Sequence, residues 1–200
     1  MSKQKVAVVT GGAQGIGKAI CDAFAEQGVA VCNIDVQDND YFVGDIADEQ
    51  VLRAFASKVI AQYGAIDYLI NNACLSRGGL KTCSHEDFNY VLRVGITAPF
   101  LLTQLFMNHF NSSASIVNIS STRHLMSQAD TESYTAAKGG HHRADPCHGR
   151  HPCRKGAGQL HLAGLDRYHR CAVQWPGCGP APCWTCGRSF GHRPCGHVFV

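Results

Sequence analysis

A tyrosine and a lysine one helical turn apart are the residues of this sequence best suited to catalysis. Tyr134 and Lys138 form a YxxxK pattern, so in a helix both side chains lie on the same face. A phenol with a pKa near ~10 transfers protons poorly at neutral pH, whereas a neighbouring ammonium favours the phenolate and lowers that pKa. Because the pattern is common by chance, an ordinary helical tyrosine is the alternative. The hypothesis of a proton-transfer pair therefore depends on the surrounding elements.

A glycine-rich turn near the N-terminus predicts a phosphate-binding site. The apolar run 6–9 predicts a strand buried on both faces, and residues 10–17 (TGGAQGIG) lead from it into a helix. Bare N–H groups at a helix N-terminus can donate to a pyrophosphate, which a side chain would hold away. A second predicted strand, residues 29–34, is followed by Asp35. Its carboxylate can accept hydrogen bonds from both hydroxyls of an adenosine ribose and would repel a 2′-phosphate. The pattern favours NAD over NADP.

Taken together, these motifs resemble the short-chain dehydrogenase/reductase family. The family pattern TGxxxGxG is present at Thr10, Gly11, Gly15 and Gly17. Residues 71–74 (NNAC) stand where the family has NNAG, and residues 134–138 match its YxxxK pattern. The resemblance covers residues 5–140 and implies an NAD-dependent oxidoreductase that interconverts an alcohol and a ketone. The implied α/β fold is a Rossmann-like doubly wound parallel sheet of order 3-2-1-4-5, with the C-terminal sixth and seventh strands and the substrate loop missing.

The resemblance also implies roles for individual residues. By it, Tyr134 transfers the proton, and Lys138 supports the phenolate and bonds the nicotinamide ribose. Ser121 holds the substrate oxygen, with Ser120 in its place if Ser121 points inward. Asp45 lies beside the adenine, with a plain loop aspartate as the alternative. The implied cofactor contacts are Thr10, Gly11, Gln14, Gly15, Ile16, Gly17, Asp35, Asp45, Ile46, Asn72, Ala73, Tyr134 and Lys138.

The sequence departs from the family pattern at two positions. Cys74 replaces the last glycine of NNAG, and we interpret it as a buried, inert thiol, with a reactive thiol as the alternative. Gly95 replaces an asparagine that in the family supports a water of the proton relay. Either that water is held otherwise, for instance by a freed backbone carbonyl, or proton delivery is slower. A binding-only dinucleotide protein is therefore a second hypothesis.

The remaining periodicity predicts the elements between the motifs. Only five residues separate Asp35 from a short strand at 41–43, too few for the usual crossover helix, so we expect an extended strap. Asp48 is the expected N-cap of a helix that Gly64 ends, and strands follow at 66–70 and 115–121. A helix from about residue 86 to 109 is expected to bend at Pro99.

Composition limits the class of protein. At 200 residues the chain suits one domain, and no apolar run is long enough to span a membrane. Residues 1–3 lead directly into the first predicted strand, so we expect no signal peptide. We expect a cytoplasmic protein with a small-molecule substrate, no membrane or nucleic-acid partner and no disulfides. The net charge of +3 comes from the C-terminal part alone, because residues 1–140 carry ten Lys/Arg against thirteen Asp/Glu. The complete parent protein is expected to be a homo-oligomer, whereas the oligomeric state of this chain stays open.

The segment 141–200 differs in composition from the rest. It holds seven of the eleven cysteines, eight of the eleven histidines and six of the seven prolines, and no amphipathic period persists in it. One interpretation is a zinc or redox site. Its candidate ligands are Cys183 and Cys186 with Cys195 and His197, and a cluster of Cys147, His148, His151 and Cys153.

The other interpretation is a frameshift near residue 140, which we favour. Shifting the frame by one base makes residues 154–176 compatible with GKVRVNCISPGWIDTTGAQFSG, which resembles the sixth strand and following PG loop of the family. Residues 182–200 become compatible with PVGRVGDPLDIARVVMFL, which resembles the segment before its last strand. One uninterrupted frame restores both motifs in order. We therefore predict a dinucleotide-binding domain over 1–140, an aberrant tail over 141–200 and no metal site.

Overall fold

The computed structural model describes residues 4–143, 159–163, 172–173 and 184–185. Its centre is a parallel sheet of order β3-β2-β1-β4-β5-β6. The strands are β1 (Val6–Thr10), β2 (Ala30–Asp35), β3 (Phe42–Val43), β4 (Ile66–Asn71), β5 (Phe110–Ile119) and β6 (Gln159–Ala163). Every residue of β1 and β4 is buried, as expected of strands covered on both faces. The predicted order 3-2-1-4-5 is confirmed.

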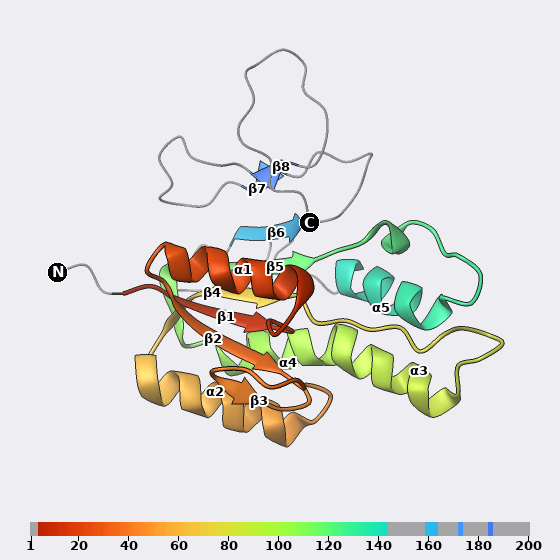
Figure 1. Cartoon of the computed structure of the whole chain (residues 1–200), viewed down its shortest axis with the longest axis horizontal. Helices are drawn as coiled ribbons and strands as arrows, with labels where there is room; N and C mark the ends of the chain where they lie inside the picture. Colours follow the sequence, from red (N-terminus) through yellow and green to blue (C-terminus); the bar gives the residue numbers. More distant parts are fainter. Residues whose placement is uncertain (1–3, 144–158, 164–171, 174–183, 186–200) are drawn as a thin grey trace, which may run out of the picture.

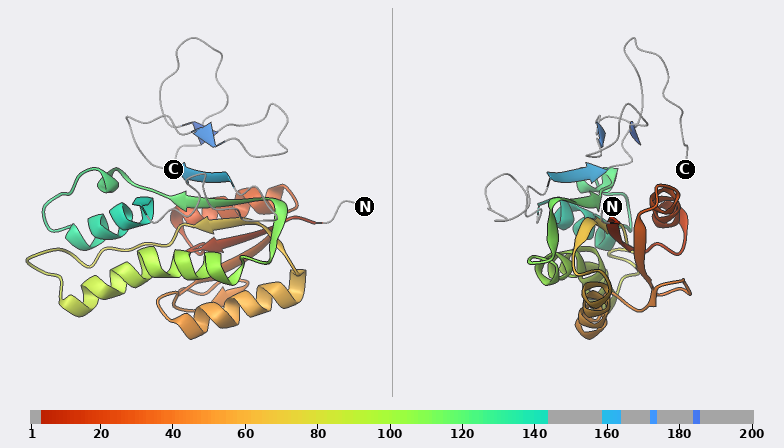
Figure 2. Two further views of the ribbon diagram at one scale, coloured as in Figure 1. Left: turned by 180° about the vertical axis from the view of Figure 1, so that it is seen from behind. Right: turned by 90° about the vertical axis from the view of Figure 1, so that its left-hand side faces the viewer.

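Helices cover both faces of this sheet (Figures 1 and 2). They are α1 (Gly15–Glu26), α2 (Glu49–Tyr63), α3 (His85–Leu92), α4 (Ala98–Leu105) and α5 (Glu132–Arg143). Phe24 of α1 packs with Ala7 and Val9 on one face of the sheet. Phe55 of α2 and Leu102 of α4 pack on the other face. The two clusters form the core that holds the carboxyl ends of the strands at one edge.

The sheet extends one strand further than we expected. We expected the sixth strand to be missing, but β6 pairs in parallel with Ser115–Ile119 of β5. The alternation of polar and apolar residues in QLHLA suits an added edge strand, and an open strand edge offers unpaired backbone groups to pair with. Two further short strands, β7 (Ala172–Val173) and β8 (Trp184–Thr185), pair antiparallel in a separate sheet. The rest of the predicted aberrant tail lies outside the described residues.

The long helix predicted over residues 86–109 is divided in the structure. A π-helical segment, η1 (Arg93–Thr97), separates α3 from α4, and α4 ends at Leu105. The cause is Pro99, which has no N–H to donate to the carbonyl of Gly95 four residues earlier. The backbone hydrogen bonds change to the π-helical spacing of five residues, and the N–H of Ala98 donates to the carbonyl of Arg93.

The predicted strap and the predicted caps of α2 agree with the structure, whereas β5 covers Phe110–Ile119 instead of residues 115–121. An extended strap without a helix joins β2 to β3, and Gly44 N–H donates to the carbonyl of Asp35 at 2.8 Å. The carboxylate of Asp48 caps α2 by accepting from Gln50 N–H, and Gly64 ends that helix at φ 78°. Within the described residues, no helix combines the length and apolar character needed to span a bilayer.

Candidate active site

The glycine-rich turn leaves open space at the N-terminus of α1. Gly15 has φ 55°, and a Cβ built there would meet no atom within 4 Å. Gly17 is constrained instead by packing, since its Cβ would lie 2.0 Å from the carbonyl oxygen of Gly11. No acidic residue lies in the first turn of α1, and the side chain of Gln14 does not cap it. The free N–H groups and the helix dipole therefore suit an anionic group such as a pyrophosphate.

Thr10 and Asn72 join the ends of β1 and β4 beneath this turn. The Thr10 hydroxyl accepts from Asn72 N–H and Ala73 N–H, both at 3.1 Å. The Asn72 amide donates to the carbonyls of Thr10 and Gly11 at 3.0 and 2.9 Å. Asn71 makes the equivalent link one strand further, donating to Asn118 at 2.8 Å. These side chains hold the strand ends, so any cofactor contact they make comes from the backbone beside them.

Asp35 lies where β2 ends, directly beside the glycine-rich turn. Its Oδ2 accepts from Ala13 N–H and its Oδ1 from Gln37 N–H, both at 3.0 Å. It is 8% exposed, and each carboxylate oxygen keeps acceptor capacity for a further donor. The structure thus brings Asp35 to the turn, as the spacing predicts.

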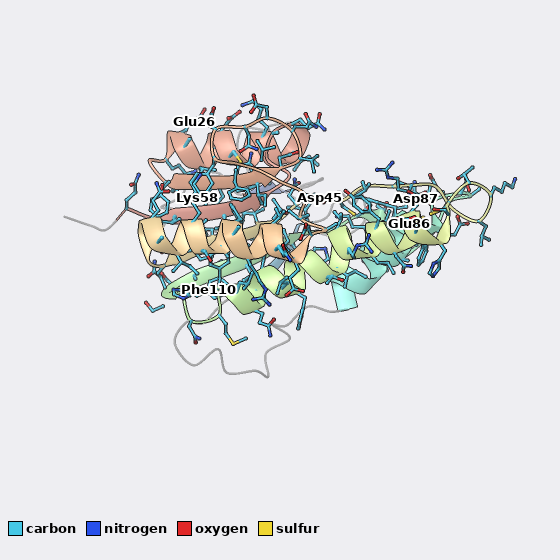
Figure 3. All side chains as sticks on the ribbon, turned by 90° about the horizontal axis from the view of Figure 1, so that it is seen from below. Glu26, Asp45, Lys58, Glu86, Asp87 and Phe110 are labelled. Carbon is cyan, nitrogen blue, oxygen red and sulfur yellow. The ribbon has the colours of Figure 1, made fainter. Side chains whose placement is uncertain are left out.

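Asp45 is tied to a residue that the sequence motifs did not single out. It lies between α2 and α3 (Figure 3), and its Oδ2 accepts from the Tyr90 hydroxyl at 3.0 Å. Its Oδ1 accepts from Ala47 N–H at 2.8 Å. Ile46 is 6% exposed in the core, so only its backbone can face a cofactor. The Asp45–Tyr90 hydrogen bond holds Asp45 in place beside α3. Motif analysis missed Tyr90 because the two residues lie 45 positions apart in the sequence.

The three predicted catalytic side chains come together at the end of β5. Ser121 follows β5, and its side chain lies near the phenol of Tyr134 on α5, where it lowers the pKa of that phenol. Lys138, one turn further along α5, lies with its Nζ 5.7 Å from the centre of the Tyr134 ring. Lys138 is 3% exposed and donates to the carbonyl of Ile119. A hydroxyl, a phenol and an ammonium thus meet at the sheet edge that also carries the glycine-rich turn.

The electrostatics of Tyr134 differ from what the motif implies. Burial raises the pKa of the phenol above its usual value, and the groups that lower that pKa are Ser121 first and then Arg123. We expected Lys138 to lower it. Lys138 instead has its own pKa lowered by burial, and its ammonium is bonded to a backbone carbonyl. Arg123 is therefore a member of the site that the motifs missed.

The two departures from the family pattern lie against each other. A Cβ on Gly95 would come within 2.8 Å of the Cβ of Ala137 and 3.5 Å of the sulfur of Cys74. Gly95 thus has no room for a larger side chain while Ala137 and Cys74 stay in place. Burial raises the pKa of the Cys74 thiol, in agreement with an inert, neutral thiol. Cys74 and Ala137 together close the space around Gly95.

A loop at residues 77–83 is bonded to the segment just before Tyr134. The carboxylate of Asp130 accepts from Gly79 N–H at 3.1 Å, Lys81 N–H at 3.3 Å and the Thr82 hydroxyl at 2.8 Å. The buried Ser133 donates to the carbonyl of Gly78 at 2.6 Å. We call these contacts the loop clamp. It holds the first turn of α5, and therefore the backbone of Tyr134, against the loop that follows β4.

Metal-ligating residues do not cluster in the part of the chain that the structure describes. No group of three His, Cys, Asp or Glu side chains there could hold an ion. The tail cysteines and histidines proposed as zinc ligands lie outside the described residues. The four described cysteines, Cys21, Cys32, Cys74 and Cys83, are free thiols.

Comparison with known proteins identifies relatives of this fold and site. The chain is 36% identical over 159 residues to an uncharacterized oxidoreductase of Thermotoga maritima, covering 70% of this chain and 62% of the relative. It is 30% identical to a 3-oxoacyl-[acyl-carrier-protein] reductase of the same organism, covering 68% and 63%. The chain therefore spans less than two thirds of the length of these relatives.

Solved structures agree with this. An apo SCOR enzyme from Clostridium thermocellum superposes with a TM-score of 0.62 at 38% identity, covering 70% of this chain and 63% of the other. A metagenomic short-chain oxidoreductase in complex with NADP superposes with a TM-score of 0.71 at 26% identity, covering 80% and 81%. The family model described as short chain dehydrogenase matches residues 5–144. This chain therefore belongs to the short-chain dehydrogenase family, whose members are oxidoreductases that bind a nicotinamide dinucleotide.

Proposed function

We propose that this chain, or the complete protein to which it corresponds, is an NAD-dependent oxidoreductase that interconverts an alcohol and a ketone. The observation that carries the proposal is that Ser121, at the end of β5, lies near the phenol of Tyr134, with Lys138 one turn away on the same helix and its Nζ 5.7 Å from the centre of the Tyr134 ring. The open space over Gly15, at the same sheet edge, fits a dinucleotide pyrophosphate. Cofactor site and proton-transfer group are thus on one edge, as hydride transfer requires.

The side chains divide the chemistry as follows. Ser121 donates a hydrogen bond to the oxygen of the substrate and orients it. Tyr134 takes the hydroxyl proton when the alcohol is oxidised and returns it when the ketone is reduced. Lys138 ties α5, the helix that carries the phenol, to the end of β5 through its bond to the Ile119 carbonyl. The chemistry that a bound nicotinamide would supply is hydride exchange with the reacting carbon.

The preference for NAD rests on Asp35. A carboxylate next to the glycine-rich turn can accept from the ribose hydroxyls, whereas a 2′-phosphate would bring like charges together. Among solved relatives, a blue fluorescent protein from a metagenomic library is in complex with NADPH, so the family as a whole does not decide the cofactor. The substitution Asp35→Ser should reduce the affinity for NADH and should lower the ratio of NADH affinity to NADPH affinity. Fluorescence titration with the two cofactors measures both affinities.

The test of the activity is cofactor reduction by a panel of alcohols, followed at the absorbance of NADH. We expect weak turnover by this chain, which lacks the substrate loop of its relatives, loss of that turnover in Tyr134→Phe, and retention of NADH binding in that variant. NADH binding without oxidation of any alcohol would support the second hypothesis, a binding-only protein, which the replacement of the relay asparagine by Gly95 favours. Failure to bind either cofactor would refute both.

We also propose that residues from about 141 onward derive from a shifted reading frame. The shifted frame restores two motifs that resemble the family in the correct order, and the family match ends at residue 144. A parent protein read in that frame would regain its substrate loop, and we expect it to turn over alcohols faster than this chain. Sequencing the coding DNA around the Gly139 and Gly140 codons tests this, because a missing or extra base there is required.

A further inference from the structure

The turn that holds Ser121 also positions an arginine. Ser121 is the N-cap of a short helix, η2 (Thr122–His124), and its Oγ accepts from the backbone N–H of Arg123 at 3.3 Å. This helix packs against α5, the helix that carries Tyr134, and Figure 1 shows the connection running from the end of β5 to α5. Arg123 therefore belongs to the same rigid corner as the serine and the tyrosine.

The guanidinium of Arg123 has no anionic partner among the residues whose side chains the structure describes, 4–141. The three ion pairs of that region join Lys18 to Asp22, Arg53 to Glu49, and Arg77 to Asp87. Arg123 is only partly exposed, and a partly buried cation without a partner loses hydration without gaining a compensating bond. A guanidinium without an ion pair keeps its N–H donors available to an anionic ligand.

The acidic groups closest in sequence are committed elsewhere. The carboxylate of Asp130 is bonded to the loop at residues 79–82, and Glu132 accepts from Leu80 N–H at 3.3 Å. The other cation of the site, Lys138, is bonded to the carbonyl of Ile119. The positive charge of Arg123 favours the ionised form of the Tyr134 phenol and so lowers the pKa of that phenol. Of the two cations near Tyr134, Lys138 is bonded to a carbonyl, whereas the Arg123 guanidinium has neither a carboxylate nor a carbonyl partner among the described residues.

We propose that Arg123 is a specificity-determining residue that binds an anionic group, a carboxylate or a phosphate, on the alcohol or ketone substrate. The inference rests on the proposed function and names the substrate class of that site. A planar guanidinium recognises either group with two parallel hydrogen bonds. With Ser121 and Tyr134 on the substrate oxygen and Arg123 on the anion, the substrate is fixed at two points, which determines which face of the reacting carbon is presented.

The experiment compares substrates that differ only in charge. One pair is a short 3-hydroxy acid and its methyl ester, and the other is glycerol 3-phosphate and glycerol, so the two arms distinguish a carboxylate from a phosphate. Each is assayed with the full chain, Arg123→Gln, Arg123→Lys and Arg53→Gln. The last removes an exposed guanidinium of α2, paired with Glu49, and serves as the matched control.

We expect the unmodified chain to prefer one charged substrate over its neutral partner. Arg123→Gln should raise KM for that substrate by about tenfold to a hundredfold, the cost of losing hydrogen bonds to a charged group, with little change for the neutral partner. Arg123→Lys should recover part of the loss, and Arg53→Gln should leave KM for both substrates unchanged. An equal effect of Arg123→Gln on KM for charged and neutral substrates would overturn the proposal. It would mean that Arg123 acts only by lowering the pKa of the Tyr134 phenol.

A binding measurement separates this proposal from the proposed function. The same four compounds are titrated calorimetrically into the chain saturated with NADH, which requires no turnover. Tighter binding of an anion that is lost in Arg123→Gln would support the anion site even if no alcohol is oxidised. Turnover of neutral alcohols with no preference for either anion, in kinetics and calorimetry alike, would refute the anion site and leave the oxidoreductase activity standing.

Discussion

The loop clamp gives a prediction whose size can be worked out from the structure. Asp130→Ala removes the acceptor of three hydrogen bonds, those from Gly79, Lys81 and Thr82. At this partly exposed site, each bond contributes about 0.5–1 kcal/mol. Asp130 also has φ 58°, a left-handed conformation that aspartate adopts more readily than alanine, so alanine loses up to about 1 kcal/mol more at this position. We expect Asp130→Ala to lower the free energy of unfolding by about 2–4 kcal/mol.

Two further variants separate the causes. Asp130→Gly removes the same carboxylate without the conformational cost, so it should be more stable than Asp130→Ala by about 1 kcal/mol. Asp48→Ala is the matched control, because the Asp48 carboxylate caps α2, far from Tyr134 in the sequence, by accepting one backbone bond at 2.8 Å. It should lower the free energy of unfolding by about 1 kcal/mol. Urea unfolding of the full chain measures all three.

The functional consequence is tested by hydrogen exchange and turnover. In the Asp130 variants, amide exchange should rise together in peptides covering residues 77–83 and 132–138, and kcat should fall more than NADH affinity. Asp48→Ala should change neither peptide. Faster exchange confined to 77–83 would show that the clamp does not hold α5. Loss of stability no greater than in Asp48→Ala would refute the hydrogen-bond accounting.

Three further predictions concern the core of the site. Gly95→Ala should lower the free energy of unfolding by about 1–3 kcal/mol, because its Cβ would lie 2.8 Å from that of Ala137, and urea unfolding measures the change. Arg123→Gln should raise the pKa of Tyr134, so the rising limb of the pH profile for oxidation of a neutral alcohol should move to higher pH. Burial lowers the pKa of His141 to about 4, so stability should be fully present above pH ~6.5 and fall by about 2–4 kcal/mol as the pH drops towards 4. Replacing His141→Leu should flatten that dependence in urea unfolding measured between pH 7.5 and 4.5.

Local patterns predicted the framework of the fold. The buried run 6–9, the glycines after it and Asp35 at the end of β2 could be predicted because a buried strand and a phosphate-binding turn each need particular residue types at adjacent positions. The caps of α2 at Asp48 and Gly64 are equally local. The meeting of Ser121 with Tyr134 was predictable because two elements of known type, a strand end and a helix start, carry them.

Contacts between distant segments could not be predicted in the same way. Asp130 accepts hydrogen bonds from backbone amides about 50 residues earlier. Every residue except proline has such an N–H group, so the sequence does not indicate which ones Asp130 bonds. Tyr90 meets Asp45 across the corner between α2 and α3. The π-helical segment depends on which carbonyl Pro99 leaves without a donor, whereas the sequence indicated only a bend there. Arg123 was visible in the sequence, but its lack of a carboxylate partner among the described residues is a fact of tertiary structure.

The crystal structure of the chain with NADH tests the central claim most directly. We predict the pyrophosphate over the N–H groups at the start of α1, beside Gly15, with the adenosine ribose at Asp35. The nicotinamide should lie between the end of β5 and α5, within reach of the Tyr134 hydroxyl. NADH bound at another place, or a nicotinamide directed away from Tyr134 and Ser121, would contradict the account.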